Sequence, residues 1–236
     1  MFKALIPVLF LASAATVFGT TSTSVSSCGP GTLASYVTNE PAPGPGCAID
    51  ILDYSNFTYT PLSNAPLASS ILLTPGSNGF DFTQVGGAPF TASGDVVKFA
   101  VYYNIFIDPA PVISGADNSL DPPVGNVNVT ELFCNDSVLY PGTTSCFPPT
   151  SPAYSLTVTT ASPTASITFA TPAAVYQTVG IIFTLDGTNG LASFDGFSTS
   201  TTTNTTTTIT PEPASTLLVG LFLLAGGYKL KKQRQS

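Results

Sequence analysis

Carboxylic acids are nearly the only side chains in this sequence that could take part in catalysis. The sequence has no histidine and no tryptophan, and between residues 20 and 210 it has no arginine and a single lysine, Lys98. A Ser-His-Asp or Cys-His arrangement and a histidine-ligated catalytic metal are therefore excluded. What remains is a carboxylate pair of the glycoside-hydrolase kind. Its candidates are Asp50, Asp53, Asp81, Asp95, Asp186 and Asp195.

These carboxylates make a weak case for an enzyme. Asp50 and Asp53 are three residues apart on a predicted strand, so they would point to opposite faces and pair poorly. Clefts that process sugars also use groups that orient and polarise the substrate, and this segment lacks the arginine, histidine and tryptophan side chains for that role. We expect no enzymatic activity and no cofactor, with a glycoside hydrolase as the weakest alternative.

Two other patterns suggest binding rather than catalysis. Residues 117–121, with the sequence Asp-Asn-Ser-Leu-Asp, would bring oxygen-bearing side chains to the first, second, third and fifth positions of a loop, which could wrap a calcium ion. The glycine and glutamate of an EF-hand are missing, and a plain polar turn explains the pattern without any metal. Four tyrosines could line a carbohydrate groove or instead fill a sandwich core: Tyr54, Tyr59, Tyr102 and Tyr103.

The four cysteines predict two disulfides. An even number in an exported chain favours this interpretation, and the absence of histidine and of a CxxC spacing disfavours a zinc site. Three connectivities are possible. Loop-closure entropy favours the local one, which joins Cys28 to Cys47 and Cys134 to Cys146.

The charge of the chain limits its partners. Of 13 acidic residues all but Glu212 lie between residues 20 and 210, where Lys98 is the one base. This segment therefore has a formal charge of −11, from 12 acids against one base. Such a surface repels phosphates, so binding to nucleic acid is excluded. The same acids could serve only to keep an extracellular domain soluble.

The elements that must carry these residues are predicted to be β-strands. From residue 97 to 107 every second residue is apolar, and period two indicates a strand with one buried face. Turn residues separate this strand from others. The strands are predicted at 49–60, 69–74, 79–84, 95–107, 126–133, 154–160, 164–170 and 175–185. With 21 prolines and no amphipathic helical stretch before residue 214, we expect an all-β, antiparallel β-sandwich, with a jelly roll as one topology.

The two ends of the chain read as targeting signals. Residues 1–22 have a positive start at Lys3, an apolar stretch and small residues, as in a cleavable secretory signal peptide. The sandwich domain is expected over 23–198 and an extended Thr/Ser-rich spacer over 199–210, although threonine would also suit an edge strand. Residues 214–230 form an apolar run, expected to be a transmembrane helix, and a basic tail follows. The positive-inside rule places that tail in the cytoplasm and the body outside.

The C-terminal 26 residues resemble the PEP-CTERM sorting signal of envelope proteins in Gram-negative bacteria. The resemblance lies in Pro211, Glu212 and Pro213, then the apolar run, then the basic tail. It implies an exosortase that recognises the Pro-Glu-Pro motif and cuts near it, and delivery to the cell surface or medium in a bacterium that makes exopolysaccharide or biofilm. An ordinary membrane anchor is the alternative.

Two classes of function follow from the sequence. The first is a non-catalytic structural protein of the cell surface or extracellular matrix. The second is a carbohydrate-binding or calcium-dependent adhesion module that uses the same delivery, with extracellular polysaccharide as its partner.

Overall fold

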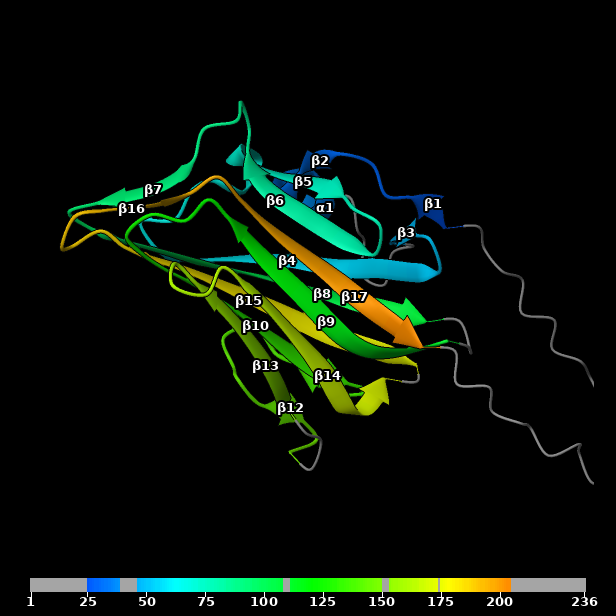
Figure 1. Cartoon of the computed structure of the whole chain (residues 1–236). Helices are drawn as coiled ribbons and strands as arrows, with labels where there is room; N and C mark the ends of the chain where they lie inside the picture. Colours follow the sequence, from blue (N-terminus) through cyan, green and yellow to red (C-terminus); the bar gives the residue numbers. More distant parts are fainter. Residues whose placement is uncertain (1–24, 39–45, 108–110, 150–152, 174, 205–236) are drawn as a thin grey trace, which may run out of the picture.

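The chain folds into two β-sheets packed face to face. A computed structural model describes residues 25–38, 46–107, 111–149, 153–173 and 175–204 (Figure 1). The predicted signal peptide, the second half of the spacer and the sorting signal, with its predicted membrane helix at 214–230, lie outside these ranges. No helix within them is long and apolar enough to cross a membrane. The all-β, sandwich-like architecture predicted from the sequence is confirmed.

The larger sheet has seven strands and the smaller has six. In spatial order the larger sheet consists of β1 (Ser26–Ser27), β3 (Cys47–Ile49), β4 (Leu52–Ser63), β8 (Val96–Ile107), β15 (Tyr176–Asp186), β10 (Asn126–Asn135) and β13 (Ala153–Thr159). The smaller sheet consists of β14 (Thr164–Ala173), β9 (Val112–Asp121), β17 (Gly196–Asn204), β6 (Gly79–Gln84), β5 (Ile71–Pro75) and β2 (Gly31–Thr32). Within both sheets every pair is antiparallel except β1 with β3.

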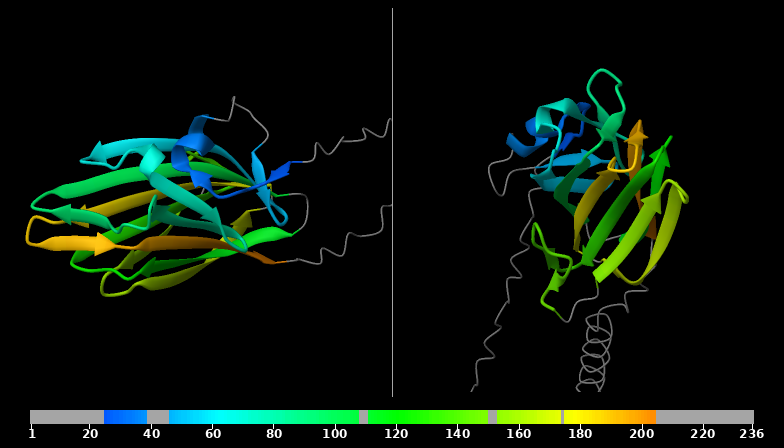
Figure 2. Two further views of the ribbon diagram at one scale, coloured as in Figure 1. Left: turned by 90° about the horizontal axis from the view of Figure 1, so that it is seen from above. Right: turned by 90° about the vertical axis from the view of Figure 1, so that its left-hand side faces the viewer.

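Short elements complete the described chain. Two small two-stranded sheets pair β11 (Val138–Leu139) with β12 (Cys146–Phe147), and β7 (Phe90–Ser93) with β16 (Leu191–Phe194). Two short helices, α1 (Leu33–Thr38) and the 3₁₀ helix η1 (Ala68–Ser70), precede β3 and β5 respectively. Figure 2 shows the two main sheets as separate layers, with the β7–β16 pair at one end of the sandwich.

The core forms where the inner faces of the two sheets meet. The alternation read in β8 is confirmed, since Phe99, Val101, Tyr103, Ile105 and Ile107 are all buried. Aromatic rings fill much of the space, and the Phe99 and Phe183 rings stack 4.5 Å apart at 14°. Such contacts add to the hydrophobic free energy of burial.

Several strands were not predicted from the sequence, and two of them, β9 and β17, change its interpretation. Residues 117–121 lie in β9 rather than in a loop. β17 continues to Asn204, so the domain boundary expected at residue 198 is wrong and the first residues of the predicted spacer belong to the sandwich. Far from being an edge, β17 lies between β9 and β6, and Phe197, Thr199 and Thr201 are buried. Short strands were missed as well: β1, β2, β7, β11, β12 and β16.

Candidate functional site

A shallow groove of about 490 Å³ runs across the outer face of the smaller sheet. Because strand residues alternate between faces, β14, β9 and β17 present hydroxyl and carboxylate groups outward here. The register places Thr164, Ser119 and Ser198 in one row across the three strands. The next row holds Ser166, Asp117 and Ser200. The lining is therefore a set of short oxygen-bearing side chains.

The groove can form hydrogen bonds but shows no constellation for catalysis. Asp117 accepts a hydrogen bond from Thr202 Oγ1 at 3.1 Å, which partly satisfies its carboxylate. No aromatic or basic side chain lines the groove. An arrangement of hydroxyls around one carboxylate suits a polyhydroxylated ligand held by hydrogen bonds alone.

Neither the calcium loop nor the polar turn considered for residues 117–121 forms, because these residues lie in β9. In β9 the side chains of Asp117 and Asp121 are exposed, whereas Asn118 is buried on the opposite face. Neighbouring side chains of a strand cannot converge on one ion in the way loop residues do. Among the described residues no three His, Cys, Asp or Glu side chains gather where they could hold a metal.

Directly beneath the groove lies a buried carboxyl group that the sequence interpretation overlooked. Glu131 of β10 is fully buried between the sheets. Tyr103 Oη of β8 donates to its Oε1 at 3.3 Å, and Thr199 Oγ1 of β17 lies 3.0 Å and 3.1 Å from its two oxygens. Because Thr199 belongs to the smaller sheet, the carboxyl group links the two layers.

Burial raises the pKa of Glu131 to about 7, although hydrogen bonds from Asn118, Thr199 and Tyr103 lower it in part. A carboxyl group with such a pKa is the kind that serves as a general acid. It has no access to solvent, however, so a substrate cannot reach it in this structure. Its role is therefore in packing, as a polar link inside the sandwich.

Strand pairing places four of the six carboxylates singled out in the sequence. Asp53 lies on the outer face of the larger sheet and Asp81 on that of the smaller, so the sandwich separates them. Asp186 is cross-strand from Val96, next to Asp95. Hydrogen bonds from Thr188 lower the pKa of Asp186, which makes it a poor proton donor.

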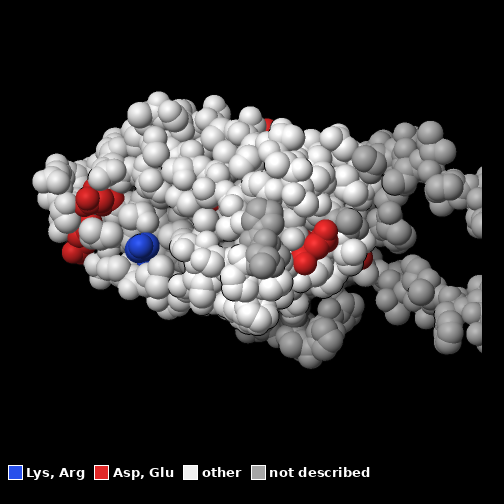
Figure 3. Space-filling model, turned by 90° about the horizontal axis from the view of Figure 1, so that it is seen from below, with Lys and Arg blue, Asp and Glu red and all other residues white. Residues whose placement is uncertain are grey.

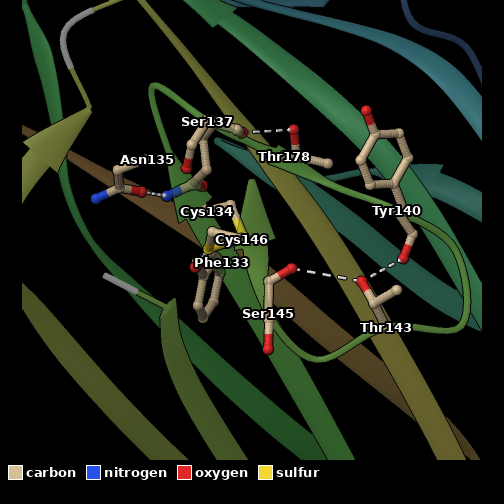
Figure 4. Close-up of a disulfide and its surroundings, with 10 residues drawn as sticks. Phe133, Cys134, Asn135, Ser137, Tyr140, Thr143, Ser145, Cys146 and Thr178 are labelled. Atoms are coloured by element: carbon tan, nitrogen blue, oxygen red, sulfur yellow. Dashed lines mark hydrogen bonds between the residues drawn. A yellow bond between two sulfur atoms is a disulfide. The ribbon is translucent and has the colours of Figure 1, made fainter. Parts of the chain in front are cut away.

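A second region of interest is a segment that crosses the outer face of the larger sheet. We call residues 136–149 the strap, which contains β11 and β12 (Figure 4). Leu139 is buried against Tyr102 and Gly180, and Tyr102 Oη accepts the N–H of Gly142 at 2.9 Å. Thr178 Oγ1 donates to the Ser137 carbonyl at 3.0 Å. The strap thus has its own small core on the back of the sheet.

Exposed aromatic rings border the strap. Tyr140 and Phe147 on the strap are 53% and 56% exposed, with ring centroids 6.2 Å apart. On the neighbouring strands Phe106 is 41% exposed and stacks at 6.0 Å on Tyr176, which is half-buried. Asp136, the first residue of the strap, links the two ring pairs, because its N–H donates to the Tyr176 carbonyl at 2.8 Å and its Oδ1 accepts the Tyr176 N–H at 3.0 Å. We call these four rings the aromatic surface.

The tyrosines proposed from sequence as a groove lining lie elsewhere. Tyr54 and Tyr103 are in the core, and Tyr102 is covered by the strap. Tyr59 is half-buried and donates a hydrogen bond to the carbonyl of Pro66. The alternative interpretation, in which the tyrosines fill the sandwich core, is correct for Tyr54 and Tyr103.

Both disulfides join the cysteines paired by the sequence argument. Cys28 is bonded to Cys47 and Cys134 to Cys146, and the described residues include no free cysteine. The first bond ties β1 to β3, and the second ties the strap to β10. Two such bonds indicate folding in an oxidising compartment.

Comparison with known proteins adds little to this description. No protein-family model matches the chain, and no curated protein matches it. Three solved chains do match. One is the structure of TmCBM61 in complex with β-1,4-galactotriose, which has 10% sequence identity and a TM-score of 0.34 over 63% of this chain and 90% of that chain. A TM-score this low defines no common fold, so the function has to be argued from the residues themselves.

Proposed function

We propose that this chain is an exported, non-catalytic structural protein of the bacterial cell surface or extracellular matrix, sorted by an exosortase system that is associated with exopolysaccharide or biofilm. The observation that carries the proposal is the pair of disulfides, which fits export through an oxidising compartment. The Pro211-Glu212-Pro213 motif, the apolar run and the basic tail support the sorting route.

Processing in the native host tests this proposal. We expect the mature protein to lack residues 1–22 and to end near Pro211, Glu212 and Pro213, and Glu212→Ala should leave the C-terminal segment in place. Mass spectrometry of the envelope and medium fractions measures both ends. Glu40→Ala is the matched control, since it removes an acid elsewhere and should be processed normally. A wild-type chain that still ends at Ser236 would contradict the proposal.

A second candidate function is a carbohydrate-binding module delivered by the same route. The specific observation in its favour is the aromatic surface, which exposes rings on the outer face of a rigid sheet. The hydroxyl-lined groove on the opposite face is a further place where a sugar could form hydrogen bonds. Binding of soluble or insoluble polysaccharides to the purified protein, without release of reducing sugar, is the outcome that this function predicts.

A further inference from the structure

We propose that the aromatic surface binds a neutral polysaccharide, with sugar rings stacked on Tyr140, Phe147, Phe106 and Tyr176. This inference rests on the second candidate function and assigns its site and its ligand class. It places the ligand on the larger sheet, not in the groove on the smaller one.

The first argument is that the rings are exposed on a firm support. Tyr140 and Phe147 belong to a strap that the Cys134–Cys146 disulfide and the buried Leu139 hold on the sheet. The backbone at Tyr140 is also fixed locally, because the Thr143 N–H and Oγ1 both donate to its carbonyl, at 3.0 Å and 2.8 Å. Rings held in this way lose little conformational entropy when a ligand covers them.

The second argument is the shape that the rings make. Phe106 and Tyr176 stand side by side on adjacent strands with their planes 29° apart, while the rings of Tyr140 and Phe147 are tilted at 56°. Separate faces of this kind fit a chain of sugar units, because each sugar presents a small face of C–H bonds. The partial positive charge of those hydrogens is attracted to the negative face of an aromatic ring.

The third argument is charge, which selects a neutral ligand. Among the residues that the structure describes, carboxyl groups beside the aromatic surface belong to Asp136 and Asp53. Asp136 Oδ1 accepts the N–H groups of Val175 and Tyr176 at 2.7 Å and 3.0 Å, and Asp53 is cross-strand from Phe106. Lys98, the one basic residue in the described ranges, is eight positions from Phe106 along β8. An acidic polysaccharide would meet repulsion here, whereas a neutral one would not.

The same charges disfavour the other occupants of an exposed aromatic surface. An anionic membrane would be repelled, and a second copy of this chain would bring the same acids against Asp53 and Asp136. Figure 3 shows one face of the molecule, on which the described residues contribute few charged side chains, mostly toward its ends. Uncharged hydroxyl-rich chains are the partner that fits such a surface.

Affinity electrophoresis of the purified full chain tests the inference, in native gels that contain neutral glucans, galactans or mannans. We expect at least one of these polymers to retard the wild type. The Tyr140→Ala/Phe147→Ala variant should lose at least ten-fold in affinity. The matched control is Val124→Ala/Leu191→Ala, which removes two side chains that are 50% and 54% exposed elsewhere, and should bind as the wild type does. Ser166→Arg, which crowds the groove, should also bind normally.

The possible outcomes separate the site from the function. Retardation that survives Tyr140→Ala/Phe147→Ala but is lost in Ser166→Arg would keep the carbohydrate-binding function and overturn this site. Retardation only by acidic polymers such as alginate would overturn the ligand class. No retardation by any neutral polymer would overturn the binding function together with this inference and leave the structural proposal standing. Dimerisation that depends on Tyr140 and Phe147 would show that a second copy is the occupant.

Discussion

At the scale of single residues, Glu131 is the most unusual feature of the structure. A carboxyl group is rarely buried without a cationic partner, because the cost of removing its charge from water is large. Here the hydrogen bonds from Tyr103 and Thr199 offset only part of that cost, and the pKa of Glu131 remains raised, to about 7. The folded protein therefore favours the protonated, neutral carboxyl group.

This predicts that stability falls as pH rises. The ordinary pKa of Glu131 is 4.5 and its folded pKa is about 7, so between these values the folded state binds more protons than the unfolded state. Its contribution is complete below about 4.5 and is lost as pH rises through about 7. Glu131→Gln should remove this slope and stabilise the protein by about 1–3 kcal/mol at pH 8. Urea unfolding at pH 5 and pH 8 measures the effect.

The tyrosines beside Glu131 do not contribute to this dependence of stability on pH. Tyr54 and Tyr103 also face Glu131, but burial raises the pKa of both phenols, so they stay neutral over this range. Asp117→Asn is the matched control, since it neutralises an exposed acid on β9 and should leave the slope unchanged. An unchanged slope in Glu131→Gln would show that the carboxyl group is solvated in the native state.

Glu131 also shows what sequence reasoning could have found and did not. In β10 it shares a face with Val127, Val129 and Phe133, so the period-two pattern already places it in the core. The residues proposed for catalysis were all aspartates, and Glu131, a glutamate within an apolar run, was not among them. The pattern predicts its burial, but not its partner Thr199, which comes from a segment read as a spacer.

At the scale of elements, the alternation of apolar residues predicted strands correctly, whereas a polar composition caused strands to be missed. β8 and β6 were predicted almost residue for residue because their apolar positions alternate clearly. β9 and β17 were missed because Ser, Thr, Asn and Asp occupy even their inward positions, such as Asn118 and Thr199. Inward polar residues are tolerated there because they face Glu131, a contact that requires the whole fold.

The position of the strap is a second feature that the alternation of apolar residues does not predict. Ala100 and Tyr102 lie on the face of β8 that the sequence marks as polar, yet both are buried. Sequence alternation cannot show that a segment some 40 residues later folds over this face. The disulfide Cys134–Cys146 was predicted, but the surface that it covers was not.

Gly180 is the position on which strap docking depends most. A Cβ at this position would lie 2.8 Å from Leu139 Cδ2 and 2.8 Å from two atoms of the Tyr102 ring. We expect Gly180→Ala to displace the strap and to lower the free energy of unfolding by about 1–3 kcal/mol, the typical cost of overpacking. Gly29→Ala is the control, because a Cβ there meets nothing within 4 Å. Urea unfolding of both variants measures the difference, and equal stability would show that the strap does not pack as described.

At the scale of the whole molecule, the two sides of the sandwich are closed in different ways. On one side β13 and β14 follow each other in sequence and join the edges of the two sheets. On the other side the N-terminal segment bridges the layers, since β1 pairs with β3 in the larger sheet and β2 pairs with β5 in the smaller. Leu33 of α1 is fully buried between them. The Cys28–Cys47 disulfide fastens this second closure.

The first and last strands of the described domain meet at one end of the sandwich (Figure 1). β1 and the end of β17 lie at the same end of the sandwich, while the β7–β16 pair lies at the opposite end (Figure 1). A body that is attached through the end of β17 would thus present the β7–β16 end away from its attachment.

The two disulfides should therefore differ in what they stabilise. Cys28→Ala/Cys47→Ala removes the disulfide from a segment that spans both sheets. We expect the free energy of unfolding to fall by about 3 kcal/mol, as for closure of a loop of this length. Hydrogen exchange should quicken throughout β1, β2 and α1. Cys134→Ala/Cys146→Ala should instead speed exchange mainly in the strap and expose Tyr102, with the N-terminal segment still protected. Hydrogen-exchange mass spectrometry with urea unfolding distinguishes the two patterns. If β2 and α1 kept their protection in the first variant and its unfolding free energy stayed unchanged, these elements would be closing the sandwich without help from the disulfide.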